Sequence, residues 1–156
     1  MAPASVLFVC LGNICRSPLA EAAFRVAAQA RRFEVCVDSA GTGGWHAGAA
    51  PDQRAQAVAL AHGVDISALR ARQVTRADFD RFTHVVAMDR DNLLALRRLR
   101  GGAGGAELSL LLDHVPGRVG GEVADPYYGG PEGFARTWAD VTAGAEGLLS
   151  VLIARP

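Results

Sequence analysis

The stretch Val6–Glu21, VLFVCLGNICRSPLAE, joins an uninterrupted apolar run to a polar loop and then to a helical pattern. Val6–Cys10 has the length and the apolar continuity of a strand that is buried on both faces. Pro18 is a residue favoured at the first position of a helix, and Leu19–Ala30 is rich in helix-forming residues. The stretch therefore predicts a strand, a tight loop and a helix in succession.

The remainder of the chain continues this alternation of strand and helix patterns. Further strands are predicted at Phe33–Val37, Val85–Met88 and Leu108–Leu112, with a loop at Ala40–Gly44. Helices are predicted at Asp52–His62, Asp91–Leu99 and Pro131–Ile153, and a capping box at Thr75–Asp78 predicts one more short helix. Buried strands that alternate with helices indicate an α/β fold, a three-layer sandwich in which helices cover both faces of a parallel sheet.

Length and composition fit a single domain, residues 1–156. The mass is 16.3 kDa and 50% of the residues are hydrophobic, which is enough for a substantial core. Sixteen acidic residues balance sixteen basic ones, so no bulk charge attracts nucleic acid or an anionic membrane. Every basic residue is an arginine, and the lack of lysine excludes a Walker A phosphate loop. The use of arginine in place of lysine, together with the many alanines, suggests a GC-rich bacterial genome.

The cysteines and the N-terminus predict a cytoplasmic protein, although export by a route without a signal peptide stays open. Three cysteines, an odd number, argue against a disulfide framework. The start of the chain has no charged segment followed by an apolar run of signal-peptide length. Leu148–Ala154 is too short to span a membrane. Cys36, in the second predicted strand, is expected to be a small core residue.

The loop Cys10–Ser17 has the form Cys-x5-Arg-Ser at the carboxyl end of the first predicted strand, where parallel sheets bind ligands. A loop that turns from a strand into a helix directs backbone N–H groups and the positive helix N-terminus toward an anion. Gly12 and Asn13 are suited to a positive φ. Arg16 adds a planar fork that matches two oxygens of a tetrahedral oxyanion, with Cys10 beneath it as a nucleophile. The alternative is a structural cysteine that happens to precede an arginine.

Asp125 is the candidate proton donor for a leaving oxygen. It lies in the glycine- and proline-rich segment Gly117–Pro131, and Pro126 favours an extended backbone at Asp125. Tyr127 and Tyr128 follow directly. An Asp-Pro turn with solvent-facing tyrosines would give the same pattern.

Trp45 lies in the loop after the second predicted strand. With Tyr127 it could form the wall of a deep slot that admits a flat phenyl phosphate, or it could simply cap the core. No metal site is predicted, because the histidines are scattered without ligand spacing, at His46, His62, His84 and His114.

Val9–Glu21 resembles, nearly residue for residue, the signature of the low-molecular-weight protein tyrosine phosphatases. Further segments resemble family landmarks in family order: Ser39–Thr42, Trp45–His46, Ala71–Gln73, Ala87–Asp89 and Asp125–Tyr128. The resemblance, to a bacterial member, covers the whole chain. It implies a four-stranded parallel sheet, no metal or organic cofactor, and hydrolysis of phosphotyrosine in proteins or peptides.

The resemblance also implies roles for individual residues. Cys10 would be the nucleophile, Arg16 the phosphate-binding residue and Asp125 the general acid. The residues around substrate would be Leu11, Gly12, Asn13, Ile14, Cys15, Ser17, Trp45, Tyr127 and Tyr128. Among these, Asn13 and Ser17 would hold the loop and the thiolate, and Cys15 would trap oxidised Cys10 as a disulfide. Inorganic phosphate and vanadate would inhibit, and the protein would be a monomer that self-associates at most weakly.

Leu69 departs from the pattern, because family members often carry a histidine two positions before the Ala-Arg-Gln segment. If that histidine orients the serine of the loop, its loss affects how the surroundings adjust the reactivity of the Cys10 thiol.

Two other functions compete with phosphatase. Arsenate reductases of similar fold relay a disulfide to later cysteines, but this chain has no cysteine after Cys36. A non-catalytic phosphotyrosine-binding module would be expected to lack Cys10 or Asp125.

Overall fold

Four parallel strands in the order β2-β1-β3-β4 form the centre of the structure, a computed structural model that describes residues 3–155. The strands are β1 (Ser5–Cys10), β2 (Cys36–Gly41), β3 (His84–Ala87) and β4 (Glu107–Leu110). The helices are α1 (Arg16–Ala30), α2 (Gln53–Ala61), α3 (Asp78–Arg81), α4 (Arg90–Arg100) and α5 (Pro131–Ala154), with a 3₁₀ helix, η1 (Leu111–His114). The predicted α/β fold with a parallel sheet is confirmed.

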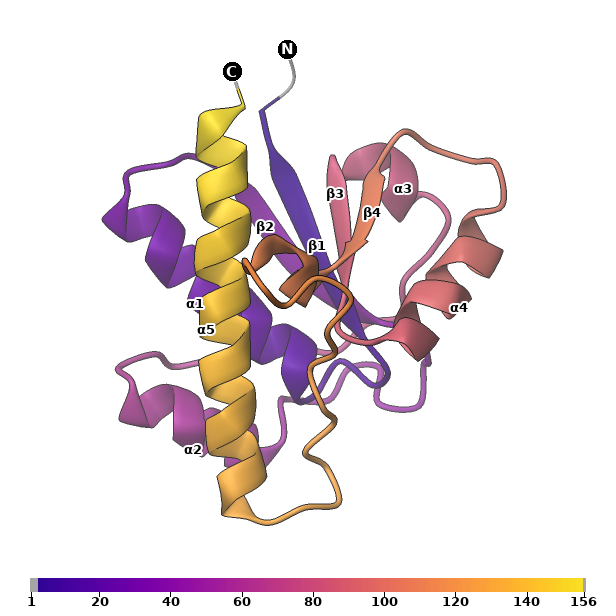
Figure 1. Ribbon diagram of the computed structural model, residues 1–156. Coiled ribbons are helices and arrows are strands. Elements are labelled where there is room, and N and C mark those ends of the chain that lie inside the picture. The colour runs from indigo at the N-terminus through magenta and orange to yellow at the C-terminus, as the bar shows by residue number, and fades with distance from the viewer. Residues whose placement is uncertain (1–2, 156) are drawn as a thin grey trace.

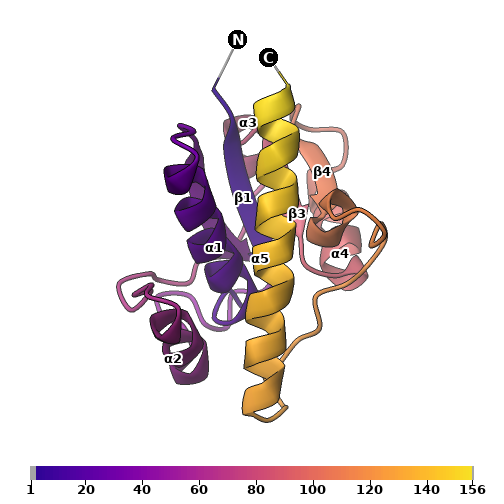
Figure 2. The same ribbon diagram turned by 60° about the vertical axis from the view of Figure 1, so that its left-hand side comes forward.

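Helices cover both faces of the sheet (Figure 1), because the side chains of β1 alternate between two apolar layers. Val6 and Phe8 pack with α1 and α5, and the ring centroids of Phe8 and Phe24 are 5.5 Å apart. Leu7 and Val9 pack on the opposite side, with residues of α3 and α4. Figure 2 shows α1 and α5 side by side on one face, with α4 beyond the sheet.

The ends of several elements differ from the sequence predictions. The strand predicted at Phe33–Val37 lies at Cys36–Gly41 instead, because pairing with β1 from Ser5↔Cys36 to Cys10↔Gly41 outweighs the weak strand propensity of its residues. Part of the predicted loop Ala40–Gly44 is therefore strand. Cys36 is exposed at the start of this edge strand, so the prediction of a core residue was wrong.

Three further boundaries moved. Helix α1 begins at Arg16, so Pro18 is its third residue rather than its first, still within the turn that tolerates proline. Residues 111–112, predicted as strand, belong to η1. Helix α3 begins at Asp78, whose carboxylate accepts a hydrogen bond from the Thr75 N–H at 2.8 Å, which is half of the predicted capping box.

Gly41 ends β2 in direct contact with the loop that follows β1. A Cβ atom at this position would lie 2.7 Å from the Leu11 carbonyl oxygen and 3.1 Å from the Asn13 nitrogen. The contact sets the loop directly against the carboxyl end of the sheet.

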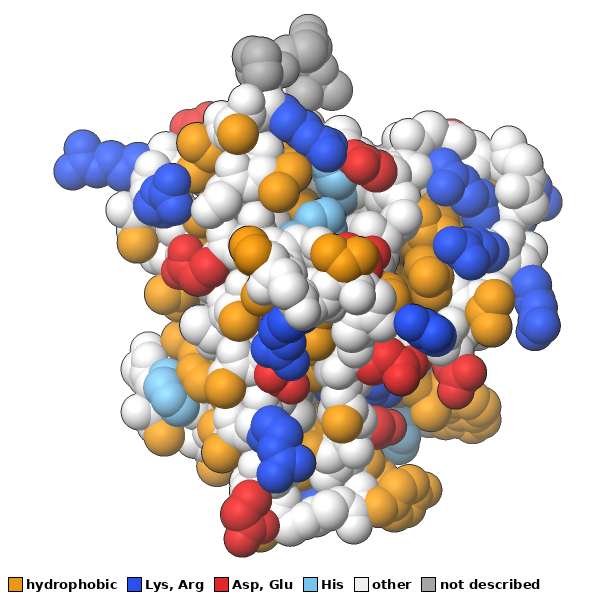
Figure 3. All heavy atoms as spheres, in the orientation of Figure 1, with side chains coloured by type: hydrophobic (Ala, Val, Ile, Leu, Met, Phe, Trp, Pro, Cys, Tyr) orange, Lys and Arg blue, Asp and Glu red, His pale blue; other side chains and the backbone are white. Residues whose placement is uncertain are grey.

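Charges of both signs are interspersed on the surface in Figure 3, with arginines gathered over α4. None of the helices within residues 3–155 combines the length and the apolarity needed to cross a membrane.

Candidate active site

The loop between β1 and α1 forms the floor of a pocket of about 240 Å³ at the carboxyl edge of the sheet. The residues of this loop and its ends that line the pocket are Cys10, Leu11, Gly12, Ile14, Cys15 and Arg16. Those that reach it from other segments are Trp45, His46, Asp125, Tyr127 and Tyr128. The structure thus brings together residues of three loops that are far apart in the sequence.

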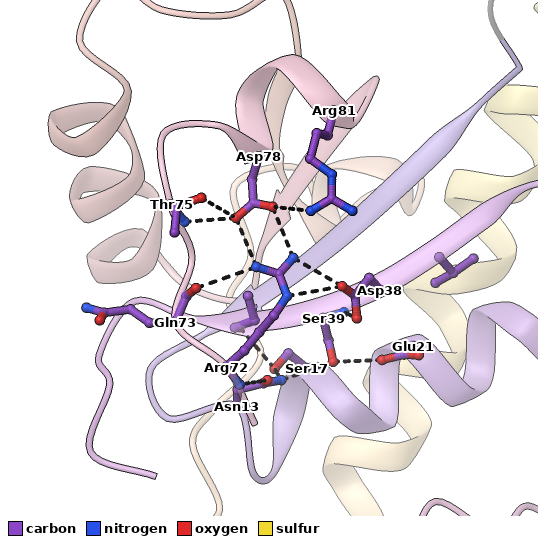
Figure 4. Close-up of polar contacts among 12 residues, drawn as sticks. Asn13, Ser17, Glu21, Asp38, Ser39, Arg72, Gln73, Thr75, Asp78 and Arg81 are labelled. Atoms are coloured by element: carbon purple, nitrogen blue, oxygen red, sulfur yellow. Dashed lines mark hydrogen bonds and ion pairs between the residues drawn. The ribbon is translucent and has the colours of Figure 1, made fainter. Parts of the chain in front are cut away.

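Asn13 and Ser17 do not line this pocket but brace the loop from behind. Asn13 has φ +57°, and its side chain fixes this backbone conformation with three hydrogen bonds. Its Nδ2 donates to Ser17 Oγ at 2.7 Å and to Ser39 Oγ at 3.0 Å, while its Oδ1 accepts from the Arg72 N–H at 3.0 Å (Figure 4). Asparagine suits this role because it tolerates the left-handed region and can donate and accept.

The hydrogen bonds behind the loop lead from Glu21 to Cys10. Ser39 Oγ donates to Glu21 Oε1 at 2.7 Å, and Glu21 is 2% exposed. An ionised carboxylate only accepts, so Ser39 uses its hydrogen there and accepts from Asn13. Ser17 Oγ also accepts from Asn13, which leaves its hydrogen for Cys10 Sγ at 3.0 Å, nearer than the alternative acceptor, the Ala40 carbonyl oxygen at 3.4 Å. The direction of the chain thus makes Ser17 Oγ the donor and Cys10 Sγ the acceptor.

The charge that faces Glu21 comes from Arg25, one helical turn along α1. Arg25 Nε and Nη2 donate to Glu21 Oε2 at 3.1 and 2.9 Å, and Nη2 also donates to the Val37 carbonyl. Arg25 is therefore the cation that compensates this buried carboxylate. Leu69 contributes no polar group here and packs against the apolar layer that contains α1 and α5.

Arg16 is 2% exposed and its guanidinium is held from two sides. Its Nη1 donates to Asp89 Oδ2 at 2.6 Å and to the Val123 carbonyl oxygen at 3.0 Å. Its Nη2 lies 3.5 Å from Asp125 Oδ2. The fork is thereby fixed beside Cys10, where it can bind two oxygens of a tetrahedral anion.

Asp125 and Asp89 both contact Arg16, but their carboxylates differ. Both oxygens of Asp89 are occupied, because Oδ1 accepts from the Asn92 N–H at 2.8 Å as the N-cap of α4. Asp125 has a 40% exposed side chain and lies on the pocket wall. Its Oδ1 accepts a hydrogen bond from the Tyr127 N–H at 3.1 Å, and this bond closes a tight turn of the loop at the pocket.

The aromatic side chains stand at the mouth of the pocket. Trp45 is 74% exposed and Tyr128 is 95% exposed, while Tyr127 is 36% exposed. The two tyrosine rings meet edge to face at a centroid distance of 4.9 Å. Trp45 therefore caps no core, and these rings are available to a flat group that enters the pocket.

His46 and the role of Gly12 were missed from the sequence. Gly12 does not have the expected positive φ. A Cβ atom on Gly12 would lie 2.9 Å from His46 Cδ2, so glycine is needed there for close packing of the imidazole on the loop. The sequence signals that could have placed His46 at the pocket were its position next to Trp45 and the resemblance of Trp45–His46 to a family landmark.

Cys15 is a buried thiol on the pocket wall. Burial, followed by the negative charge of Asp52, raises the pKa of Cys15 to about 12. Cys15 therefore stays protonated near neutral pH. Within residues 3–155, no three His, Cys, Asp or Glu side chains are grouped as a metal site.

Comparisons with known proteins agree on one family. A family model described as low molecular weight phosphotyrosine protein phosphatase matches residues 5–155. The low molecular weight protein-tyrosine-phosphatase YfkJ of Bacillus subtilis is 42% identical over 148 residues, which cover 94% of each chain. The crystal structure of a protein tyrosine phosphatase from Entamoeba histolytica superposes with a TM-score of 0.90 at 35% identity, covering 96% of this chain and 97% of that one. A Drosophila arginine phosphatase superposes with a TM-score of 0.90 at 30% identity, covering 97% and 99%.

Proposed function

We propose, from the premise that this chain belongs to the low molecular weight phosphotyrosine protein phosphatase family, that it hydrolyses phosphotyrosine in proteins and peptides. The observation that carries the proposal is the convergence of Cys10, Arg16 and Asp125 on one pocket. This set offers a nucleophile, a binding fork for the transferred group and a proton donor, which are the three parts that the reaction needs.

In the first step, the thiolate of Cys10 attacks phosphorus and forms an S–P bond while the bond from phosphorus to the phenolic oxygen breaks. Asp125, protonated at this stage, gives its proton to the departing oxygen. Arg16 and the N–H groups of the loop bind the equatorial oxygens, whose charge must be stabilised in the transition state.

In the second step, water attacks phosphorus and the S–P bond breaks. Asp125, now ionised, accepts the proton of that water, and inorganic phosphate and the Cys10 thiolate are released. Ser17 donates a hydrogen bond to the leaving thiolate, as the hydrogen-bond chain from Glu21 favours. Phosphate and vanadate should occupy the same loop as inhibitors.

The walls of the pocket favour an aromatic substrate. Leu11 and Ile14 are apolar on the loop, and Trp45 and Tyr127 present rings at the mouth. A phenyl ring is stabilised by such surfaces through burial and stacking. A phosphoarginine substrate would place a planar, polar guanidine at the same position. On the described pocket wall, Asp125 is the one carboxylate that could pair with this guanidine, so the lining suits a phenyl ring better.

Cys15 would protect the nucleophile from irreversible oxidation beyond the sulfenic acid. A sulfenic acid at Cys10 can condense with the Cys15 thiol, which forms a disulfide and releases water. Both cysteines line the same pocket. A later reductant would restore the thiolate of Cys10.

The test is hydrolysis of a phosphotyrosine peptide, with matched phosphoserine and phosphoarginine peptides, in the presence of EDTA. We expect turnover of phosphotyrosine alone, inhibition by vanadate and no turnover by Cys10→Ser. Preferred turnover of phosphoarginine would assign the substrate class of the Drosophila relative instead. Binding of the phosphotyrosine peptide without any turnover would identify a binding module.

A further inference from the structure

The segment that carries Asp125 and Tyr127 has few attachments to the rest of the protein. Before it, the Val123 N–H donates to the Met88 carbonyl oxygen at 2.9 Å, and after it α5 begins at Pro131. Between these two points, the backbone bonds of the described chain stay within the segment and the first turn of α5. What holds the segment over the pocket must therefore come from side chains.

Arg54, the second residue of α2, makes such side-chain contacts with the segment. Its Nη1 donates to the Gly129 carbonyl oxygen at 3.5 Å. In the described chain, this hydrogen bond and the ion pair of Arg16 with Asp125, also at 3.5 Å, are the polar contacts that reach residues 124–130 from elsewhere. Its guanidinium carbon lies 5.5 Å from the ring centre of Tyr127 and 4.6 Å from that of Phe134, which is 2% exposed at the start of α5. These are cation–π distances to both sides of the segment.

Asp52 connects this arginine to the loop that binds phosphate. Its carboxylate pairs with Arg54 through both oxygens, from Nε to Oδ1 and from Nη2 to Oδ2, each at 3.0 Å. Asp52 also caps α2 through the Arg54 N–H, and its own N–H donates to the Ile14 carbonyl oxygen at 2.9 Å. The fixed fork of an arginine is thus anchored on one side to the loop and on the other to the Asp125 segment.

We propose that Arg54 is a positioning residue for the general acid: it holds the Asp125 segment at a fixed place over the phosphate-binding loop. The inference rests on the proposed phosphatase function. Arg54 does not line the pocket and has no contact with the reacting atoms. Its effect must therefore appear through Asp125, in proton delivery, and through Tyr127, in the binding of the ring, while the anion site stays intact.

The experiment compares Arg54→Met with Arg118→Met. Arg118 is a matched control, because it pairs with Asp140 at 3.0 Å, its side chain is also 41% exposed, and it does not line the pocket. For both variants and the wild type, kcat and KM are measured on phosphotyrosine and on an aryl phosphate with a strongly acidic phenol. Inhibition by inorganic phosphate and the thermal midpoint are measured alongside.

We expect Arg54→Met to lose roughly tenfold in kcat/KM on phosphotyrosine, a part of the ~10²–10⁴-fold that a general acid contributes. The kcat/KM on the acidic phenol should fall much less, and the inhibition constant of phosphate should stay near the wild-type value. Arg54→Lys, which keeps the charge but not the fork, should fall between wild type and Arg54→Met. Arg118→Met should match the wild type.

Equal losses in kcat/KM on both substrates, or kcat/KM values equal to those of the wild type, would overturn the positioning role while leaving the phosphatase function in place. A wild type without activity on either substrate would instead remove the proposed function itself. The two failures are thus separated by the wild-type measurement.

Discussion

Arg16 and Asp89 form an ion pair of 2.6 Å in which the aspartate has no free oxygen, since its second oxygen caps α4. Of the two aspartates beside Arg16, Asp89 is therefore suited to hold the guanidinium, and Asp125, on the pocket wall, to exchange a proton with a substrate. The proposed mechanism thus gives the two carboxylates on one arginine separate tasks, and mutation can distinguish them.

Asp125→Ala should lose ~10²–10⁴-fold in kcat/KM on phosphotyrosine, the usual contribution of a general acid to the step that breaks the bond to the phenolic oxygen. On an aryl phosphate with a strongly acidic phenol the loss in kcat/KM should be much smaller, because that phenolate departs without a proton. Inhibition by phosphate should change little. Asp89→Asn should instead weaken phosphate inhibition and lower activity on both substrates by a similar factor. The reverse pattern would exchange the roles of the two aspartates.

Cys10→Ser should abolish turnover but retain binding of phosphate and vanadate, because the loop N–H groups and Arg16 are unchanged. Isothermal titration with vanadate measures the binding, and hydrolysis of an aryl phosphate measures the turnover. A serine variant that worked near the wild-type rate would rule out the phosphocysteine intermediate.

Peroxide treatment should produce a Cys10–Cys15 disulfide at a rate that rises with pH. The attacking group is the Cys15 thiolate, and burial raises the pKa of Cys15 to about 12. Its thiolate fraction therefore grows about tenfold for each pH unit below that value. Rapid quenching with a thiol-blocking reagent, followed by peptide mapping, gives the rate of closure. A closure rate that levels off near pH 8 would contradict the raised pKa of Cys15.

Glu21→Gln should lower kcat by about tenfold, the equivalent of one hydrogen bond to a charged group. A glutamine amide can donate as well as accept, so it no longer dictates the direction of the chain through Ser39 and Asn13 to Ser17. Arg25→Met should have a smaller effect, because the Arg25 side chain is half exposed. Equal effects of the two variants would show that the pair acts through packing of α1 rather than through the hydrogen-bond chain.

The free energy of unfolding should fall as the pH drops below about 6.5, the usual pKa of histidine. Burial lowers the pKa of both His84 and His114. The unfolded chain then binds protons that the folded protein does not, so stability is full above that pH and decreases below it. Urea unfolding at pH 7.5 and 5 measures the decrease, and His114→Asn should reduce it. The prediction fails if the variant loses as much stability as the wild type between these two pH values.

Local patterns predicted the parts of the structure that local interactions decide. Val6–Cys10 was recognised as a strand because a strand buried on both faces is apolar at every position. The predicted position of β2 was wrong. Asp38 and Ser39 have little strand propensity, and the pairing with β1 determines which residues form the strand. Propensity carries no information on that pairing.

In the site, too, local sequence patterns predicted some residues, while contacts between distant residues could not be predicted. The Cys-x5-Arg-Ser spacing placed Cys10 and Arg16 at the pocket, since a loop between strand and helix has few conformations. No pattern indicated that Asp89 would hold Arg16, or that Arg54 would reach the Asp125 segment, because these contacts join residues that are far apart in the sequence. Such partners depend on the packing of whole elements.

Asn13 has a consequence for binding thermodynamics. Its three side-chain hydrogen bonds hold the left-handed backbone of Asn13, and with it the loop, through partners that all belong to the protein itself. The conformational entropy of this loop is therefore lost when the chain folds and not when an anion arrives. We therefore expect the affinity of an anion for this loop not to be reduced by an ordering cost of ~1–2 kcal/mol for each loop residue.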